Sequence, residues 1–245
     1  MIGLKEFSQN ITTLTSLTCS HISRPQSIDM LIIADCFPFL EELDLSYPSY
    51  CENSMFDRVK TLLSALSNLQ KVNLTKHSYI NNQFLFHLFN SCKCLEEAII
   101  FRCPEVTNVG IASALGEALT LRSLSFTNYF EPQECSMLFD LVKNSPSLSE
   151  IRMEYNFENS FETSNSFMDL VVRPQLKSLC LTHNSRLRDE TIKIFSSIFP
   201  NLQLLDLINC SGISDEGICE VLRCCKIRQL NLARSLKVKL LWTEL

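Results

Sequence analysis

Residues 202–218 read LQLLDLINCSGISDEGI. The first half of this stretch alternates as a β-strand does, because Leu205 and Leu207 lie two residues apart and therefore share one face. Leu204, Asp206 and Ile208 occupy the alternate positions and point to the other face. The pattern predicts a short strand whose inward leucines belong to a core.

A helix is expected directly after this strand. Asp215 stands where a helix N-cap is favoured, and Ile218, Val221 and Leu222 follow it at helical spacing. Cys210 falls in the turn between strand and helix, where a small side chain can pack inward and hydrogen-bond weakly to the backbone. One unit of the chain is thus a strand, a turn and a helix.

The leucine spacing of this unit recurs along the whole chain. The pattern Leu-x-x-Leu-x-Leu, with other apolar residues allowed, begins near residues 14, 40, 69, 95, 121, 148, 176, 202 and 227, at steps of 25 to 29 residues. This period is typical of leucine-rich repeats. The sequence therefore predicts one α/β domain over residues 1–245, a ribonuclease-inhibitor-like horseshoe of about nine repeats. Parallel strands should line its concave side and helices its convex side.

Composition and charge argue against several classes of protein. The hydrophobic share is 46% and the charged share 20%, which is ordinary for a folded chain. Five glycines in 245 residues are too few to favour a nucleotide-binding loop. The formal net charge is −5 and no basic cluster is present, so we expect no nucleic-acid binding.

The sequence also bears on location and chemistry. It has no stretch typical of a signal peptide or a membrane span, so we expect no membrane association and twelve reduced cysteines in the cytoplasm or nucleus. The cysteines and histidines lack zinc-ligand spacing, and no nucleophile motif occurs. We therefore expect no metal, no cofactor, no catalytic residue and no enzymatic activity. The acidic pairs at 189–190 and 215–216 share one repeat phase and are interpreted as helix N-terminal residues.

Two stretches carry a resemblance to a known family. Residues 202–218 and residues 95–111 resemble the cysteine-containing leucine-rich repeats of F-box proteins, particularly the plant ones, and residues 176–192 look like a cysteine-free version. The resemblance implies a substrate-recognition subunit of an SCF-type ubiquitin ligase that acts in ubiquitin-dependent protein degradation. In that family the repeats hold a protein target, while an N-terminal F-box binds the cullin-ligase adaptor.

The sequence departs from this family at both ends. We identify no F-box before the first repeat, and residues 2–9 look like a helix that closes an earlier repeat. Residues 233–245 follow the last repeat pattern without a clear helix or polar cap. Binding of the cullin-ligase adaptor is therefore expected only if the full-length protein has an F-box.

A protein target is expected on the concave face, which the outward strand positions line. Most of these positions are polar, and the exceptions place apolar groups where solvent is expected. The candidate partner-binding residues are Ile99, Phe101, Tyr129, Glu150, Arg152, Glu154, Leu204, Asp206 and Ile208. For the aromatic residues of the turns, burial against the sheet edge is an equally good interpretation.

Three functions remain open at this point. The leading one is a protein-interaction module similar to the repeat half of an F-box receptor. The second is an adaptor-independent scaffold or truncated paralogue, including a fragment related to immune receptors. A GTPase-activating repeat protein would require a catalytic arginine and an acidic tail, whereas Arg152 is the only central concave arginine and the tail is basic.

Overall fold

The computed structural model of the chain describes residues 6, 11, 13–21, 27–49, 55–128, 134–155, 171–235 and 237–238. The chain divides into two compact units, Met1–Phe126 and Thr127–Leu245. The interpretation of residues 1–245 as a single domain stays a prediction. The helix expected over residues 2–9, of which only residue 6 is described, and the end of the chain after residue 238 lie outside the described residues.

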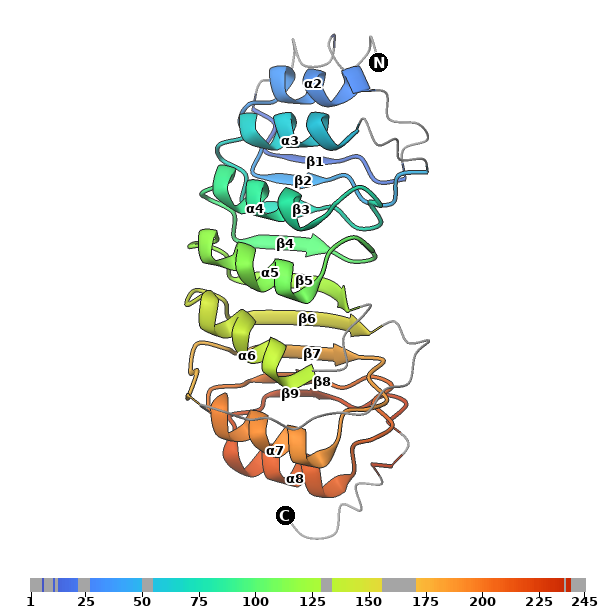
Figure 1. Ribbon diagram of the computed structural model, residues 1–245, viewed down its shortest axis with the longest axis vertical. Coiled ribbons are helices and arrows are strands. Elements are labelled where there is room, and N and C mark those ends of the chain that lie inside the picture. The colour runs from blue at the N-terminus through green and yellow to red at the C-terminus, as the bar shows by residue number, and fades with distance from the viewer. Residues whose placement is uncertain are drawn as a thin grey trace. The chain divides into compact units, whose positions relative to one another are not determined.

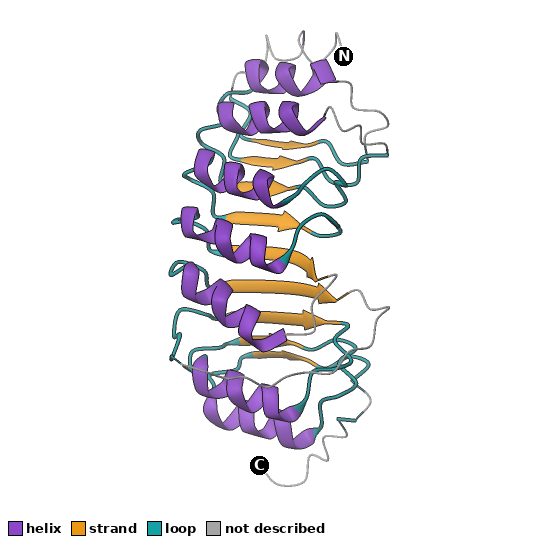
Figure 2. Cartoon of the chain, viewed as in Figure 1, coloured by secondary structure: helices purple, strands orange, loops and turns teal. Residues whose placement is uncertain are grey.

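The first unit is built from short parallel strands that follow one another in chain order. Its strands are β1 (Ser16–Thr18), β2 (Glu42–Asp44), β3 (Lys71–Asn73), β4 (Glu97–Ile100) and β5 (Ser123–Asn128), whose last two residues belong to the second unit. The helices are α2 (Ser27–Cys36), α3 (Met55–Ala65), α4 (Asn82–Ser91) and α5 (Asn108–Ala114), followed by the 3₁₀ helix η1 (Leu115–Glu117). The helices cover one face of the strands (Figures 1 and 2).

The second unit repeats this arrangement. Its strands are β6 (Glu150–Tyr155), β7 (Ser178–Thr182), β8 (Leu204–Asp206) and β9 (Gln229–Asn231), and they pair in parallel and in chain order. Its helices are α6 (Glu134–Asn144), α7 (Asp189–Ile198) and α8 (Asp215–Cys224). These helices again lie on one side of the strands (Figure 2).

The register of the strands confirms the α/β leucine-rich-repeat solenoid. Each strand begins two residues after the leucine that opens its sequence repeat, because that leucine packs in the turn before the strand. The middle residue of each short strand then points to the helices. Leu43, Val72, Ala98 and Leu124 are aligned and buried in the first unit, as Ile151, Leu179 and Leu205 are in the second.

The cysteines after two strands have the structural role expected from the sequence. The Cys103 thiol donates to the carbonyl oxygen of Leu74 over 3.3 Å, and the Cys210 thiol donates to that of Leu181 over 2.8 Å. Both cysteines are buried. Each thiol therefore satisfies a backbone carbonyl of the preceding repeat, where an unpaired buried acceptor would be destabilising.

The start of α8 differs from the sequence prediction. The N-cap is Ser214, whose hydroxyl accepts the backbone N–H of Glu216, and Asp215 is the first helical residue. The backbone N–H of Ser214 in turn donates to Asp189 Oδ1 over 2.8 Å. Asp189 thereby ties the first turn of α7 to the N-cap of α8. A Cβ atom at Gly217 would lie 2.5 Å from Asp189 Oδ1, so this close approach requires glycine.

Candidate protein-binding face

The side chains at the outward strand positions form what we call the open face, the surface of each unit's strands that points away from the helices. In the first unit the strand register aligns these side chains in rows that run across the strands. In the second unit β6 to β9 align theirs in the same way. All eight candidate residues on described positions belong to these rows or follow directly after them.

The outermost row of the first unit is an ion-pair ladder. Lys71 on β3 lies between Glu42 on β2, at 3.2 Å, and Glu97 on β4, at 3.9 Å. Hydrogen bonding to Lys71 lowers the pKa of the Glu42 carboxyl, and the same contact raises the pKa of Lys71. Glu42 and Lys71 are exposed and Glu97 is half-buried, so the ladder contributes little stability but presents charges of both signs.

The next row brings Ile99 beside two polar side chains. Asn73 donates through Nδ2 to Asp44 Oδ2 over 3.0 Å, and the backbone N–H of Ser46 donates to Asp44 Oδ1 over 2.8 Å. Ile99 aligns with Asn73 in the register and is half-buried. Phe101, directly after β4, is also half-buried. Both residues therefore keep apolar surface accessible beside charged neighbours.

In the second unit, β6 supplies Glu150, Arg152 and Glu154 on alternate positions, with Glu150 and Arg152 exposed and Glu154 half-buried. The sequence analysis missed Cys180, which aligns with Arg152 but is only 3% exposed. Burial raises the pKa of the Cys180 thiol, while the charge of Arg152 acts in the opposite direction. Arg152 thus interacts with a protonated thiol next to it and stays accessible to a partner.

The remaining candidates of the second unit lie on or after β8. Asp206 accepts the backbone N–H of Ile208 over 3.0 Å through Oδ1, and the side-chain amide of Asn231 over 3.4 Å through Oδ2. Much of its hydrogen-bonding capacity is therefore used within its own repeat and toward the next one. Leu204 and Ile208 are half-buried, and the carbonyl oxygen of Ile208 accepts the N–H of His183 over 2.8 Å.

One candidate partner-binding residue is not among the described residues. Tyr129 is outside the described residues, as are the turn aromatics Tyr50, Phe130 and Phe157. Tyr47 is described, and its ring is stacked on that of His21 with the centroids 5.0 Å apart.

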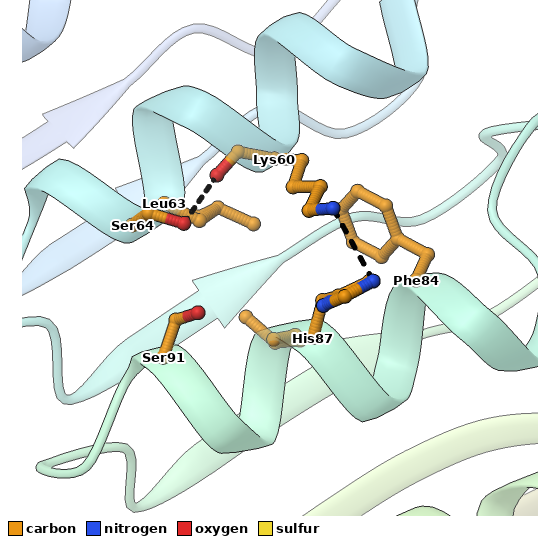
Figure 3. Close-up of a pocket in the computed structure, with 7 residues that line it drawn as sticks. Lys60, Leu63, Ser64, Phe84, His87 and Ser91 are labelled. Atoms are coloured by element: carbon orange, nitrogen blue, oxygen red, sulfur yellow. Dashed lines mark hydrogen bonds between the residues drawn. The ribbon is translucent and has the colours of Figure 1, made fainter.

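A shallow pocket between α3 and α4 is not part of the open face (Figure 3). Lys60 donates through Nζ to Nε2 of His87 over 3.2 Å, and Ser64 donates to the carbonyl oxygen of Lys60. Phe84 closes the pocket on the α4 side (Figure 3). Its two basic groups, Lys60 and His87, contact each other. The pocket is therefore a gap in the packing between two helices, and we assign no ligand to it.

The described residues also bear on membrane and metal binding. No helix there is long and apolar enough to cross a membrane. In the same residues, no group of three or more His, Cys, Asp or Glu side chains could hold a metal ion.

Comparison with known proteins shows that this chain is similar to solved structures in its fold. No family model and no curated protein matches the sequence. A chain of the yeast Rad7–Elc1 complex is 18% identical, with 96% of this chain and 67% of that chain covered, at a TM-score of 0.58. The leucine-rich repeat-containing protein LegL7 from Legionella pneumophila is 14% identical, covering 91% of this chain and 94% of that one, at a TM-score of 0.37. The repeat period and the strand register place this chain among proteins of the leucine-rich-repeat fold.

Proposed function

We propose that the chain is a protein-interaction module that holds a protein target on its open face and is not itself an enzyme. More specifically, it acts as the substrate-recognition part of an SCF-type ubiquitin ligase receptor of the F-box/leucine-rich-repeat kind, in ubiquitin-dependent protein degradation. It works in the cytoplasm or nucleus by presentation, because it holds the target while other subunits perform the chemistry.

The observation that carries this proposal is the chemistry of the open face. Half-buried apolar side chains, Ile99 and Phe101 in the first unit and Leu204 and Ile208 in the second, stand beside charged ones. Aromatic and arginine side chains with accessible surface are the usual energetic centres of protein interfaces. We therefore assign the main target contacts to Phe101 and Arg152.

The family assignment is supported more indirectly. The repeat of residues 202–218 resembles those of F-box proteins, and its Cys210 has the structural role that its position in the motif predicts. The yeast chain of the same fold was solved in a complex of two proteins, Rad7 and Elc1. A cullin-ligase adaptor is a partner only where an F-box accompanies the repeats.

The alternative is an adaptor-independent scaffold. It would also bind its target on the open face, but binding would not lead to degradation of the target. Under the ligase proposal, removal of the protein from cells should raise the amount of its target and lower the ubiquitination of that target. Under the scaffold alternative, the target should still bind and its lifetime should not change.

The experiment compares open-face variants with matched controls in the full chain. Tagged wild type, Phe101→Ala and Arg152→Ala are purified from cells, and co-purified proteins are quantified by mass spectrometry. The controls are Phe86→Ala, on the outer side of α4 where Phe86 is 43% exposed, and Arg122→Ala, outside the strands. Truncation of an interface centre costs about 2 kcal/mol or more, which is about thirtyfold in affinity.

A protein that is lost with both open-face variants and retained by both controls is the expected result, with all melting temperatures similar. Its ubiquitination and half-life are then measured with and without the chain. Equal retention of every co-purified protein by open-face and control variants would contradict the proposal.

A further inference from the structure

A second surface of the first unit lies at the ends of its strands. Seven residues after the leucine that opens each repeat stand His21, Tyr47, Lys76 and Arg102, and all four have left-handed backbone, with φ values of 57°, 55°, 69° and 55°. We call these four residues the strand-end row. They follow the carboxyl ends of β1 to β4, which lie along one side of the unit (Figure 1).

Backbone hydrogen bonds hold this row in register. The N–H of Tyr47 donates to the carbonyl oxygen of Thr75 over 2.9 Å, and the N–H of Lys76 donates to that of Phe101 over 2.8 Å. The hydrogen bonding between neighbouring repeats therefore continues to Tyr47 and Lys76, each three residues beyond the end of its strand. Successive members of the row are consequently about one strand spacing, about 4.8 Å, apart.

The side chains of the row also contact one another. The rings of His21 and Tyr47 are stacked, with an interplanar angle of 9° and centroids 5.0 Å apart. The ammonium of Lys76 lies over the same Tyr47 ring, 5.9 Å from its centroid. Arg102 occupies the next position and is exposed. The row therefore presents an aromatic ring flanked by basic groups as one continuous surface.

The backbone turn does not by itself require these side chains. In the second unit the same position is left-handed at His183, Asn209 and Arg234, and β5 and β6 continue through it as strand. Glycine and asparagine tolerate left-handed backbone best, whereas tyrosine, lysine and arginine are disfavoured there. Bulky aromatic or basic side chains therefore occupy left-handed positions in both units, and in the first unit four of them follow one another in successive repeats.

We propose that the strand-end row binds an acidic segment of a partner protein, a short extended run of aspartate and glutamate. The proposal rests on the proposed function, since it names a chemical feature of the protein partner. Four adjacent strands span about 14 Å, and an extended chain rises about 3.3 Å per residue, so the segment that covers the row has about four or five residues.

Charge complementarity favours this occupant. The chain as a whole carries a net charge of −5, whereas the row carries two permanent positive charges and a histidine. The carboxylates of the neighbouring rows already accept hydrogen bonds or pair within the unit, Glu42 with Lys71 and Asp44 with Asn73. Carboxylates of a partner would be attracted to Lys76 and Arg102, both of which are exposed.

A nucleic acid fits the same surface less well. Stable binding of a phosphate backbone depends on many Lys and Arg contacts that release counterions. The row offers few such groups, and the open face beside it carries the carboxylates of Glu42, Asp44 and Glu97. These carboxylates would repel a continuous line of phosphates, while a short acidic segment can remain on the row.

The test is fluorescence anisotropy on the full chain. The probe is a labelled peptide with six consecutive acidic residues between Gly-Ser flanks, and the reference peptide has Gln and Asn in their place. The variant is Lys76→Gln with Arg102→Gln, which removes both charges and leaves a shorter polar side chain at each position. The matched control is Lys93→Gln with Arg122→Gln, which removes two exposed charges of the same unit away from the row.

We expect the wild type to bind the acidic peptide at least about tenfold more tightly than the neutral one, with an affinity that falls as salt rises. The row variant should lose about tenfold in affinity and the control variant less than about twofold, with unchanged thermal melts. Equal binding of the two peptides by the wild type, or equal binding by the row and control variants, would overturn the proposal. Tighter binding of a single-stranded oligothymidylate, lost in the row variant, would overturn it in favour of nucleic acid.

The outcome is separable from that of the proposed function. If Phe101→Ala and Arg152→Ala lose a partner while the row variant binds the acidic peptide like the wild type, only the inference about the row fails. If the row binds as expected but no partner depends on Phe101 or Arg152, the assignment of the open face fails instead.

Discussion

His77 occupies in its repeat the position that Cys103 and Cys210 occupy in theirs, and this makes the stability of the first unit sensitive to acid. The His77 side chain is 2% exposed. Its Nε2 atom donates to the carbonyl oxygen of Leu45 over 2.8 Å, as the cysteine thiols donate to the preceding repeat. Burial lowers the pKa of His77 to about 4, although the Leu45 hydrogen bond and the charge of Asp44 both raise it.

The direction of the effect follows from which state binds the proton first. In the unfolded chain the histidine pKa is about 6.5, so the unfolded state takes up a proton as the pH falls below that value while folded His77 stays neutral. The free energy of unfolding therefore falls between pH 6.5 and pH 4. With a folded pKa of about 4, the loss is about 2 kcal/mol at pH 5 and about 3 kcal/mol once the pH is below 4.

The assay compares the wild type with His77→Cys. This variant has at position 77 the same residue type as Cys103 and Cys210, and its thiol does not titrate in this pH range. Guanidinium unfolding is followed by circular dichroism at pH 7.5, 6 and 5. The carboxylates titrate in both proteins, so the difference between the two free energies of unfolding isolates His77. From pH 7.5 to pH 5, we expect the free energy of unfolding of the wild type to fall by about 2 kcal/mol relative to that of His77→Cys. The same difference at both pH values would refute the reasoning.

Four further predictions concern the core, two glycines and the thiols. Leu205→Ala should lower the free energy of unfolding by about 2 to 5 kcal/mol, because Leu205 is 1% exposed; an unchanged melt would contradict the register. Gly217→Ala should destabilise by about 1 to 3 kcal/mol through its contact with the preceding helix. Gly116→Ala, whose new methyl meets no atom within 4 Å, should be neutral or slightly stabilising in the same denaturation assay. Burial raises the pKa of Cys92 to about 12, so iodoacetamide at pH 8 should alkylate exposed Cys94 at least about tenfold faster, as peptide mapping would measure.

The repeat architecture was predictable because equivalent buried positions of a solenoid recur in the sequence at a regular spacing. The inward positions of each strand must be apolar, so Leu205 and its equivalents appear in the sequence at one period. The small residue after the strand was predictable for a similar reason, since the buried turn has room for a thiol such as Cys103 and a carbonyl that needs a donor.

Other features depend on contacts between repeats and leave a weaker trace in the sequence. Ser214 and Asp215 are both good N-cap residues, and the choice of Ser214 is fixed by its bond to Asp189, which is 25 residues away in the chain. The equivalence of His77 and Cys103 was missed because a histidine does not resemble a cysteine in sequence, although both donate to the same kind of carbonyl.

The strand-end row was not predicted, because its residues lie after the strands and share no residue type. The signal was present in the spacing, since Tyr47 and Lys76 are 29 residues apart and Lys76 and Arg102 are 26 apart, like the repeats themselves. What the spacing could not supply is the left-handed backbone and the stacking of His21 on Tyr47, which bring these side chains into one surface.

The central claim is that the open face, and not the helix face, binds a partner protein. Photo-crosslinking in cells tests it most directly, with the full chain carrying p-benzoylphenylalanine at either Ile99 or Phe86. Both positions have accessible side chains, the first on β4 of the open face and the second on α4. The account predicts a discrete crosslinked protein for the probe at Ile99 and none for the probe at Phe86. The same crosslinks from both positions, or crosslinks from Phe86 alone, would contradict it.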